Sequence, residues 1–520
     1  MLSTGMRGIF RAGSLLLLTS FIISGCKTVG PDFEKPDVPV ADSWLDTENE
    51  QVDSSSTNYQ DWWSVFEDPT LSKLIDTAYQ QNLSLQVAGL RVMESRAQLG
   101  IATGLKYPQS QSVGGGYGYS RSSINAPPLS NLPDDVRQNV DRTTGVWTAS
   151  FDAGWEADVW GKFRRGVEAA DASLAASMLN YDAVLVTLTG DVAALYTSIR
   201  TLQERLDFAR TNVQLQEQAL KLANSQFEFG ATSELDVQQA KGLLYNTESL
   251  IPLLTLDLER AQNALSFLLG MPPSDLGTML GTSRKIPTPP SSVAVGVPAD
   301  LLRRRPDVRA AEMAAAASSA NIGISQADLY PSFVLAGSLG LAGGSFSDLF
   351  DGGATTGFIT PFFKWNILNY GRIKNNVRVQ DARFEQAVTT YQNTALAAAK
   401  EVQDGLQGFL RTQEAVGYLD KAVNASARAA ELALVQYRQG AADYTRVLNT
   451  QTALLLQQDE LTAMRGQVVS NLVATYKALG GGWQLREGNN YISPDVINSM
   501  EIRTDWGDLL MTPEQAEETN

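Results

Sequence analysis

Residues 147–161 read WTASFDAGWEADVWG, and this stretch decides the fold. From Trp147 to Val159 apolar residues alternate with polar or small ones, as in a strand that has one apolar face and one wet face. Aromatic residues near both ends of such a run are typical of strands that cross an outer membrane. A strand of a soluble antiparallel sheet alternates in the same way. The run therefore predicts a strand and leaves its surroundings open.

The strand belongs to a large internal duplication. Residues 160–270 can be laid without a gap over residues 370–480. Upstream, Tyr107-Pro108 recurs as Tyr330-Pro331 at a slightly different offset. Each half therefore predicts a helix, a Tyr-Pro pair, a β-hairpin, an aromatic-Gly pair and a very long helical stretch. Matched positions include Gln203 and Gln413, Phe227 and Tyr437, Gly230 and Gly440, Asp236 and Arg446, and Gln239 and Asn449.

Two β-hairpins are predicted, at about 110–160 and about 332–370. In the first, Val113 to Tyr119 alternates ahead of the run quoted above; in the second, Phe333 to Leu341 precedes a return strand from Ile359 to Ile367. Glycines near Gly114 and Gly340 lie within these strands. Phosphate-binding glycines instead stand between a strand and a helix start, so a nucleotide loop is disfavoured.

Helical sequence dominates the rest of each half. One helix is expected from about 71 to 105, and another from about 162 to 228 would run roughly 100 Å at ~1.5 Å per residue. Tight turns are expected near Gly230 and Gly440. After the first turn, residues 234–269 would fold back as a coiled-coil partner. Its packing stripe is Leu243, Leu244, Leu250, Leu253 and Leu254.

Composition excludes several classes of function. The 520 residues contain no His and one Cys, and the net charge is −16. Without His, most catalytic triads and the commonest transition-metal ligand are missing, and an acidic chain is a poor partner for nucleic acid. We therefore expect no enzyme, no catalytic residues, no metal, no cofactor and no nucleic-acid partner.

The amino terminus is expected to be a secretory signal peptide followed by a lipid-attachment site. Residues 1–25 have the positive start and short apolar run of a secretory signal peptide. Ile23-Ser24-Gly25-Cys26 resembles the bacterial lipobox, in which the Cys becomes the lipid-modified first residue. Lys27 stands where an inner-membrane retention signal would usually have Asp, so the resemblance implies delivery to the outer membrane. Residues 26–61 then form a lipidated, extended segment.

The geometry of the predicted strands and helices favours a tube that is assembled from several chains. Four membrane strands cannot close a barrel, since the smallest single-chain barrels use about eight, and open edges are forbidden in lipid. We therefore expect an α+β membrane protein. Three chains would form a 12-stranded outer-membrane β-barrel, with four strands per chain, continued by a long periplasmic α-helical coiled-coil barrel. A small mixed equatorial region would complete the fold.

This architecture resembles the TolC-like outer-membrane efflux family, in its lipoprotein (OprM/NodT-type) branch. Four stretches carry the resemblance: residues 62–71 (WWSVFEDPTL), 301–308 (LLRRRPDV), 321–331 (NIGISQADLYP) and 476–483 (YKALGGGW). It covers essentially the whole mature chain. It implies a first repeat at 62–270, a linker at 271–300, a second repeat at 301–483 and an equatorial tail at 484–520.

The resemblance also implies a function. The chain would be the exit duct of a tripartite efflux system, passively conducting small molecules or drugs to the exterior. Its partners would be two further copies in a homotrimer, a periplasmic membrane-fusion adaptor, an inner-membrane pump of the RND type, and outer-membrane lipid. It would span the outer membrane, lipid-anchored, with a large periplasmic extension. The alternatives are a type I protein-secretion exit channel and a periplasmic coiled-coil scaffold lipoprotein without a pore.

By resemblance, the turns near Gly230 and Gly440 form a closed periplasmic gate. Asp236 and Tyr437 would link neighbouring coiled coils as a carboxylate–phenol latch. The remaining gate positions are Asp443, Tyr444, Arg446 and Asn449. Arg446 and Asn449 stand where the family pattern has pore-facing Asp, and Ala442 stands where it has Arg.

The run Arg303-Arg304-Arg305-Pro306-Asp307 has two interpretations. Proline suits the first turn of a helix, and an aspartate there faces the positive end of the helix dipole. A helix start is therefore favoured over a ligand site.

Overall fold

The structure is a computed structural model that describes residues 28–53, 55 and 59–510, without the side chain of Leu302. The signal peptide and Cys26 lie outside the described residues. The chain divides into two compact units, and each takes residues from both repeats. The first holds residues up to Lys35 with Ser95–Leu174 and Met313–Val388; the second holds Pro36–Glu94, Ala175–Glu312 and residues from Thr389 onward.

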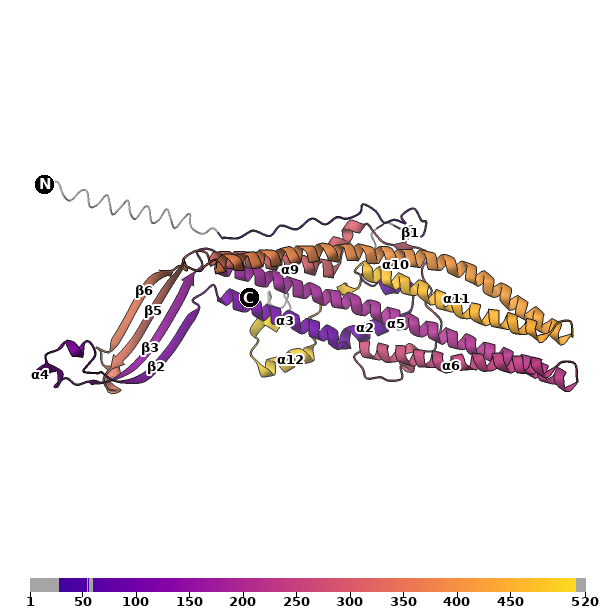
Figure 1. The fold of residues 1–520 in the computed structure, drawn as a ribbon, viewed down its shortest axis with the longest axis horizontal. Helices are drawn as coiled ribbons and strands as arrows, with labels where there is room; N and C mark the ends of the chain where they lie inside the picture. The colour runs from indigo at the N-terminus through magenta and orange to yellow at the C-terminus, as the bar shows by residue number, and fades with distance from the viewer. Residues whose placement is uncertain (1–27, 54, 56–58, 511–520) are drawn as a thin grey trace. The chain divides into compact units, whose positions relative to one another are not determined.

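A four-stranded antiparallel sheet forms the centre of the first unit (Figure 1). Its order is β2-β3-β5-β6, so two hairpins lie side by side through β3 and β5. This confirms two hairpins and four strands per chain. The strands are β2 (Ser110–Arg121), β3 (Thr143–Ala157), β5 (Ser332–Gly343) and β6 (Thr355–Lys364). Short helices fill the hairpin loops: η2 (Leu129–Asn131), α4 (Asp134–Arg137) and η4 (Ser347–Phe350).

The register gives this sheet one apolar face and one polar face. Phe151 of β3 lies opposite Val113 of β2 and Leu339 of β5, and residues directly opposite one another point to the same side. Val113 is 84% exposed and Ile359 of β6 is 78% exposed. So much exposed apolar surface favours a lipid environment over water. The other face is mostly small or polar in β2 and β3, whereas β6 places Phe358 and Phe362 on it; its polar residues include Ser112, Thr148, Ser150, Asp152 and Ser338.

The helix expected from about 71 to 105 is in fact two helices, α2 (Pro69–Gln81) and α3 (Leu83–Gly104). The break comes at Asn82, whose backbone is extended. The Asn82 side chain accepts from the amide of Leu85 (2.9 Å) and donates to the carbonyl of Leu268 (2.8 Å). A local side-chain cap therefore starts a second helix where the apolar spacing shows no interruption.

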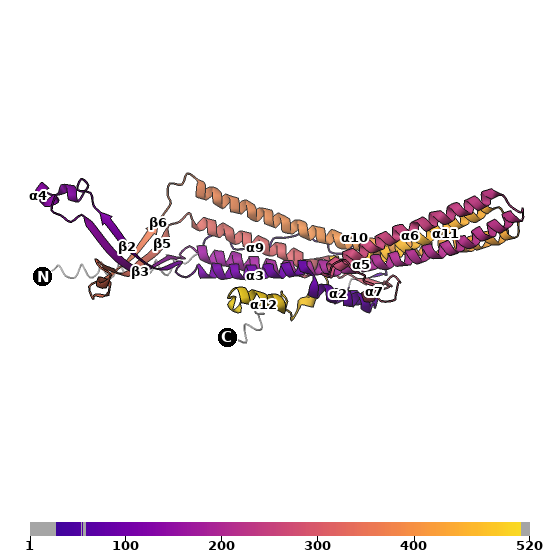
Figure 2. The same ribbon diagram turned by 90° about the horizontal axis from the view of Figure 1, so that it is seen from below.

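Two antiparallel helical hairpins extend through the second unit (Figure 2). They are α5 (Lys162–Glu228) with α6 (Glu234–Leu268), and α10 (Arg372–Arg438) with α11 (Tyr444–Ala478). Gly230 (φ 71°) and Gly440 (φ 73°) take the left-handed backbone that favours glycine. Beyond each glycine, the next amide bonds back to a glutamine carbonyl, Ala231 to Gln226 (2.8 Å) and Ala441 to Gln436 (2.9 Å). The two predicted turns therefore have one geometry.

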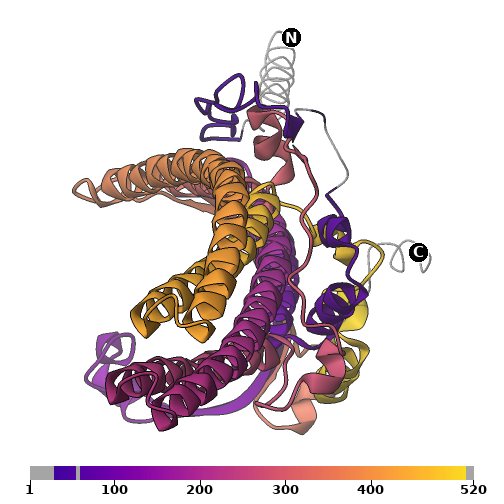
Figure 3. The ribbon, with the colours of Figure 1, turned by 90° about the vertical axis from the view of Figure 1, so that its right-hand side faces the viewer.

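The hairpins lie side by side (Figure 3), and contacts between α5 and α11 help to join them. Arg205 forms a two-point ion pair with Asp459 (2.7 and 2.9 Å). A Cβ on Gly466 would lie 2.1 Å from the Thr201 hydroxyl, so the helices approach closely there. In α6, Leu243, Leu244 and Leu254 of the predicted stripe are buried, whereas Leu253 is 59% exposed and does not belong to it.

α5 is the one described helix that is long and apolar enough to cross a membrane, judged by length and composition. Of its apolar window, 61% is buried inside the protein. Because most of that window is buried within the protein, its apolar residues are used in packing.

A small mixed region completes the second unit and agrees with the predicted one. β1 (Val52–Asp53) pairs in parallel with β4 (Val293–Ala294). Trp62 is 2% exposed and stacks on Tyr476, with ring centroids 5.5 Å apart. The short elements are η1 (Trp62–Phe66), α7 (Gly277–Leu280), η3 (Pro298–Asp300), α8 (Leu301–Arg304), η5 (Trp483–Arg486), α12 (Pro494–Arg503) and η6 (Gly507–Leu510); α9 (Pro306–Ala327) has residues in both units.

Candidate functional site

The structure brings Asp236 and Tyr437 together at the tip of the hairpins. Asp236 lies in the first turn of α6, where a carboxylate suits the positive helix end. Tyr437 lies in the last turn of α10, and its hydroxyl donates to Asp236 Oδ2 over 3.2 Å. The Thr232 hydroxyl donates to the same oxygen. The carboxylate therefore ties the turn of the first hairpin to a helix of the second.

This contact lies beside an apolar cluster shared by both hairpins. Tyr437 is 3% exposed and packs edge-on against Tyr444, which is 1% exposed (ring centroids 5.2 Å apart, 76° between planes). The cluster comprises Ala219, Ala223, Val237, Ala240, Ala433, Tyr437, Tyr444 and Val447. Burial raises the pKa of Tyr437, an effect to which the Asp236 charge adds, and burial raises the pKa of Tyr444 to about 12. Both phenols are therefore neutral hydrogen-bond donors at neutral pH.

Sequence reasoning missed a second link at the tip. Gln226 of α5 donates from Nε2 to the backbone carbonyl of Tyr437 over 3.2 Å. Its counterpart Gln436 instead accepts from Arg446 Nη1, also over 3.2 Å, within the second hairpin. The overlay of the repeats pairs Gln226 with Gln436, which is the signal that could have drawn attention to them.

The other predicted gate residues do not join the Asp236 contact. Asp443 caps α11 by accepting from the amide of Arg446 (3.3 Å). Arg446 and Asn449 are exposed on the first turns of α11. Tyr444 takes part only through its packing against Tyr437. Of the six residues, the structure therefore gathers Asp236, Tyr437 and Tyr444 at one point.

Alkaline pH is expected to loosen this tip. A phenol whose pKa is raised on folding contributes its stability fully below the unfolded value of 10.0, and this stability is lost as pH rises towards about 12. The thermal stability of the purified protein should therefore fall between about pH 10 and pH 12. Tyr444→Phe should make this loss of thermal stability smaller. Part of the loss should remain, because burial also raises the pKa values of Tyr196 and Tyr476 to about 12. Identical pH curves for wild type and variant would contradict the assignment.

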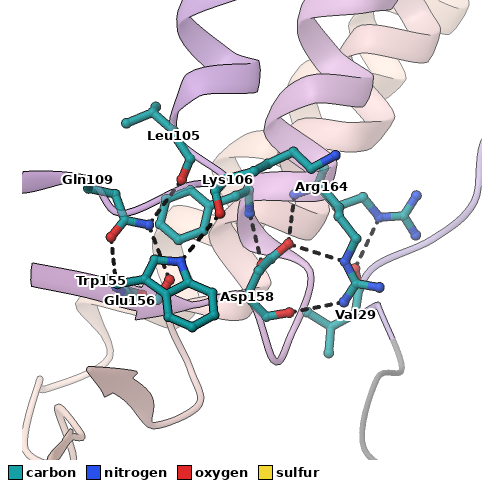
Figure 4. Close-up of polar contacts among 10 residues, drawn as sticks. Val29, Leu105, Lys106, Gln109, Trp155, Glu156, Asp158 and Arg164 are labelled. Carbon is teal, nitrogen blue, oxygen red and sulfur yellow. Dashed lines mark hydrogen bonds and ion pairs between the residues drawn. The ribbon is translucent and has the colours of Figure 1, made fainter. Parts of the chain in front are cut away.

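In the first unit, polar contacts fasten the base of the sheet to the start of α5 (Figure 4). Asp158 accepts from the amides of Phe163 (3.1 Å) and Arg164 (2.9 Å), so it satisfies the free donors of the first helical turn. Trp155 donates from Nε1 to the carbonyl of Lys106 (3.4 Å). Gln109 exchanges hydrogen bonds with the backbone of Glu156. These contacts therefore hold both ends of the first β-hairpin, just before β2 and just after β3.

The first described residues of the chain dock at the same base. The amide of Val29 donates to the Trp160 carbonyl over 3.0 Å. Arg165, with a side chain 4% exposed, donates to the carbonyls of Val29 and Gly30 and forms an ion pair with Asp32 over 2.7 Å. Gly30 (φ 96°) lies so close to α9 that a Cβ would come within 2.4 Å of the Gly323 Cα. The segment that follows Cys26 is therefore held to the start of α5.

Arg305, from the arginine run, occupies a structural site. α9 begins at Pro306, in agreement with the favoured interpretation. The Arg305 guanidinium, 10% exposed, forms ion pairs with Asp307 (2.6 Å) and Glu401 (2.7 Å). It also donates to the carbonyl of Ala478 over 2.9 Å. The Arg305 guanidinium thus links the start of α9 to α10 and to the end of α11.

Within the described ranges, no group of three or more His, Cys, Asp or Glu side chains is placed to hold a metal ion. The glycines that could suggest a phosphate loop lie inside β2 and β5. What the chain does present is a membrane-type sheet with two outer strands and two long helical hairpins. These features define the class of outer-membrane channels that continue as a helical duct.

The chain belongs to the outer membrane efflux protein family, whose model matches residues 74–271 and 297–481. It is 32% identical to the pyoverdine export outer membrane protein OpmQ of Pseudomonas putida, over 82% of this chain and 88% of that protein. It is 29% identical to the probable outer membrane lipoprotein SilC of Salmonella typhimurium, over 91% of this chain and 100% of that protein.

The solved outer-membrane channel OprN has the same fold, with a TM-score of 0.80 at 29% identity; the match covers 88% of this chain and 99% of that one. The predicted fold class and family are thereby confirmed. The fold is that of the TolC-like trimeric outer-membrane channels, and the protein is an outer-membrane efflux channel that extends into the periplasm. The family and its solved neighbours are channels rather than enzymes.

Proposed function

We propose that the protein is the passive exit duct of a tripartite efflux complex, with a tip that is latched shut until its partners dock. A periplasmic membrane-fusion adaptor and an inner-membrane pump of the RND type would complete the complex. The pump supplies the energy and most of the substrate choice, and the duct itself carries out no catalysis. The description of OpmQ as an export protein supports this assignment.

The observation that carries the proposal is the hydrogen bond between Tyr437 and Asp236. It joins the two hairpins at their tips, beside the Gln226 contact and the apolar cluster that both hairpins share. Exposed apolar side chains stand close to it, including Phe229 (86% exposed) and Leu235 (63% exposed). Apolar surface at a loop tip suits docking of another protein. An adaptor that binds there would act directly on the latch.

Passive transport can be tested with the purified protein alone. Asp236→Ala protein in lipid vesicles should release a small trapped dye down its gradient, without ATP and without a proton gradient. Wild-type vesicles should release it more slowly, because the tip stays latched. A scaffold without a pore would release no dye in either form. Release that required an energy source would contradict a passive duct.

We propose further that Cys26 carries the lipid anchor and that outer-membrane lipid is a direct partner. The lipoprotein description of SilC supports this, as does the docking of Val29 and Gly30 on the start of α5. Acyl chains on Cys26 would add apolar area to the membrane contact, and more than one chain is needed for a durable hold.

Arg165→Leu is expected to release the anchored segment from the base of the sheet. The substitution removes the ion pair with Asp32 and both carbonyl contacts while keeping an apolar side chain of moderate size. Protease cleavage between the anchor and residue 36 should become at least several-fold faster in purified protein. Asp32→Asn, which keeps the carbonyl contacts, serves as the matched control and should accelerate cleavage less. Equal cleavage rates in wild type and Arg165→Leu would show that the segment is held by other contacts.

A further inference from the structure

The two repeats make equivalent contacts at the base of the sheet. Trp155 donates from Nε1 to the carbonyl of Lys106 (3.4 Å), and its counterpart Trp365 donates to the carbonyl of Leu329 (3.0 Å). Lys106 and Leu329 each precede a Tyr-Pro pair. The overlay of the repeats therefore holds in three dimensions at this level, and a contact made by one repeat has a definable counterpart in the other.

One contact at this base joins the first repeat to the second. The Trp160 ring, just after β3, stacks on the Tyr330 ring, just before β5 (centroids 4.6 Å apart, 24° between planes). Trp160 Nε1 also donates to the carbonyl of Pro331 over 2.8 Å. The aromatic pair thus lies where two neighbouring strands, β3 and β5, leave the sheet.

The counterparts of these rings are exposed. Tyr370 follows β6 and corresponds to Trp160, and it is 98% exposed. Tyr107 precedes β2 and corresponds to Tyr330, and it is 66% exposed. Tyr370 also has φ 49°, a left-handed backbone that a tyrosine rarely adopts. Such strain is found where the surroundings have a functional reason to hold it.

β6 and β2 are the outer strands of the sheet, so these two exposed rings flank the two edges that must be covered in lipid. We propose that Tyr370 of each chain stacks on Tyr107 of a second copy, with its hydroxyl donating to the carbonyl of Pro108. This interaction rests on the proposed duct, because it needs β6 of one copy to pair with β2 of the next. It repeats between chains the contact that Trp160 and Tyr330 make within one chain.

The two contacts differ in chemistry. Within the chain, Lys162 forms an ion pair with Asp328 over 2.8 Å beside the aromatic stack. The counterpart positions are Arg372 and Leu105, which cannot form an ion pair. Tyrosine, with an apolar ring and a polar tip, is a common anchor between protein surfaces. Because no ion pair accompanies it, the aromatic pair contributes a larger part of the binding energy between copies than the Trp160–Tyr330 pair contributes within a chain.

Cross-linking distinguishes the two contacts. In full-length protein in outer membranes, Tyr107→Cys with Tyr370→Cys should be joined by a short bismaleimide into covalent dimers and trimers on a denaturing gel. The matched pair Trp160→Cys with Tyr330→Cys should be joined within single chains, as peptide mass mapping would show. Wild type and each single-cysteine variant should give several-fold less chain-to-chain product than the tyrosine pair. Chain-to-chain product no greater than in the single variants would overturn the proposal.

A second measurement guards against misfolding of the cysteine variants. Tyr370→Ala should lower the temperature at which detergent-resistant oligomers dissociate, whereas Tyr370→Trp, the residue of the first repeat, should preserve it. Equal dissociation temperatures for wild type and Tyr370→Ala would count against the tyrosine pair. Cross-linked copies that conduct no ions in planar bilayers, even with Asp236→Ala, would defeat the proposed duct and leave this contact standing. Normal ion conduction without cross-linking would defeat this contact alone.

Discussion

Tyr437→Phe is expected to raise the ionic leak through the purified channel at least about tenfold. The change removes one hydroxyl that donates to the Asp236 carboxylate over 3.2 Å and leaves the buried ring in place. A hydrogen bond to a charged group contributes about 1.5–3 kcal/mol, and about 1.4 kcal/mol is a factor of ten in an equilibrium. If the latches of three copies open together, the effect on the open fraction multiplies. Single-channel recording in planar bilayers measures it.

The control for this variant is Tyr245→Phe, the same change on α6 at a side chain that is 60% exposed. It should leave the leak unchanged. Asp236→Ala should raise the leak at least as much as Tyr437→Phe, because it also removes the Thr232 contact. Combining Tyr437→Phe with Asp236→Ala should add little to Asp236→Ala alone, since both act on one bond. Fully additive effects would show that the residues act separately.

Arg305→Met is expected to destabilise the folded channel strongly. Methionine matches the length of the apolar stem, but Asp307 and Glu401 lose their common partner and the carbonyl of Ala478 loses a donor. Breaking a buried ion pair costs about 3–5 kcal/mol, and the partial exposure of both carboxylates places this case near the lower end. The temperature at which the purified protein unfolds should fall by several degrees.

Glu401→Gln is the matched control for this prediction. Glutamine keeps an oxygen acceptor for Arg305, and Glu401 is 54% exposed, so its charge is screened by water. Its effect on the unfolding temperature should be a small fraction of that of Arg305→Met. Equal destabilisation of the two variants would contradict this prediction. It would show that the charge of Glu401 contributes more to stability than the other contacts of the Arg305 guanidinium.

Much of the fold could be predicted because its signals are periodic. Strict alternation along residues 147–157 fixes which side chains share a face, and the register confirms that Phe151, Val113 and Leu339 lie together. The duplication predicted two hairpins and two tips, and the turns at Gly230 and Gly440 share one hydrogen-bond pattern. Periodicity could not predict the break at Asn82, which a single side-chain cap creates.

Contacts between distant residues were harder to predict. Arg165 and Asp32 are separated by 133 residues, and no pattern around either residue points to the other. The pairing of Asp236 with Tyr437 came from family resemblance rather than from local sequence. Gln226 and Gln436 occupy matched positions, yet only Gln226 bonds across the hairpins. Gln436 is bound by Arg446 of its own hairpin. The residue that corresponds to Arg446 in the first repeat is the acidic Asp236.

We propose that the Asp236–Tyr437 contact holds the duct shut. The most direct test joins Asp236→Cys and Tyr437→Cys with a reducible bismaleimide and records conductance in planar bilayers before and after reduction. We predict a low conductance while the linker is intact and a several-fold rise when it is cleaved, repeatable on relinking. The same conductance in both states, with cross-linking verified by mass spectrometry, would contradict the account.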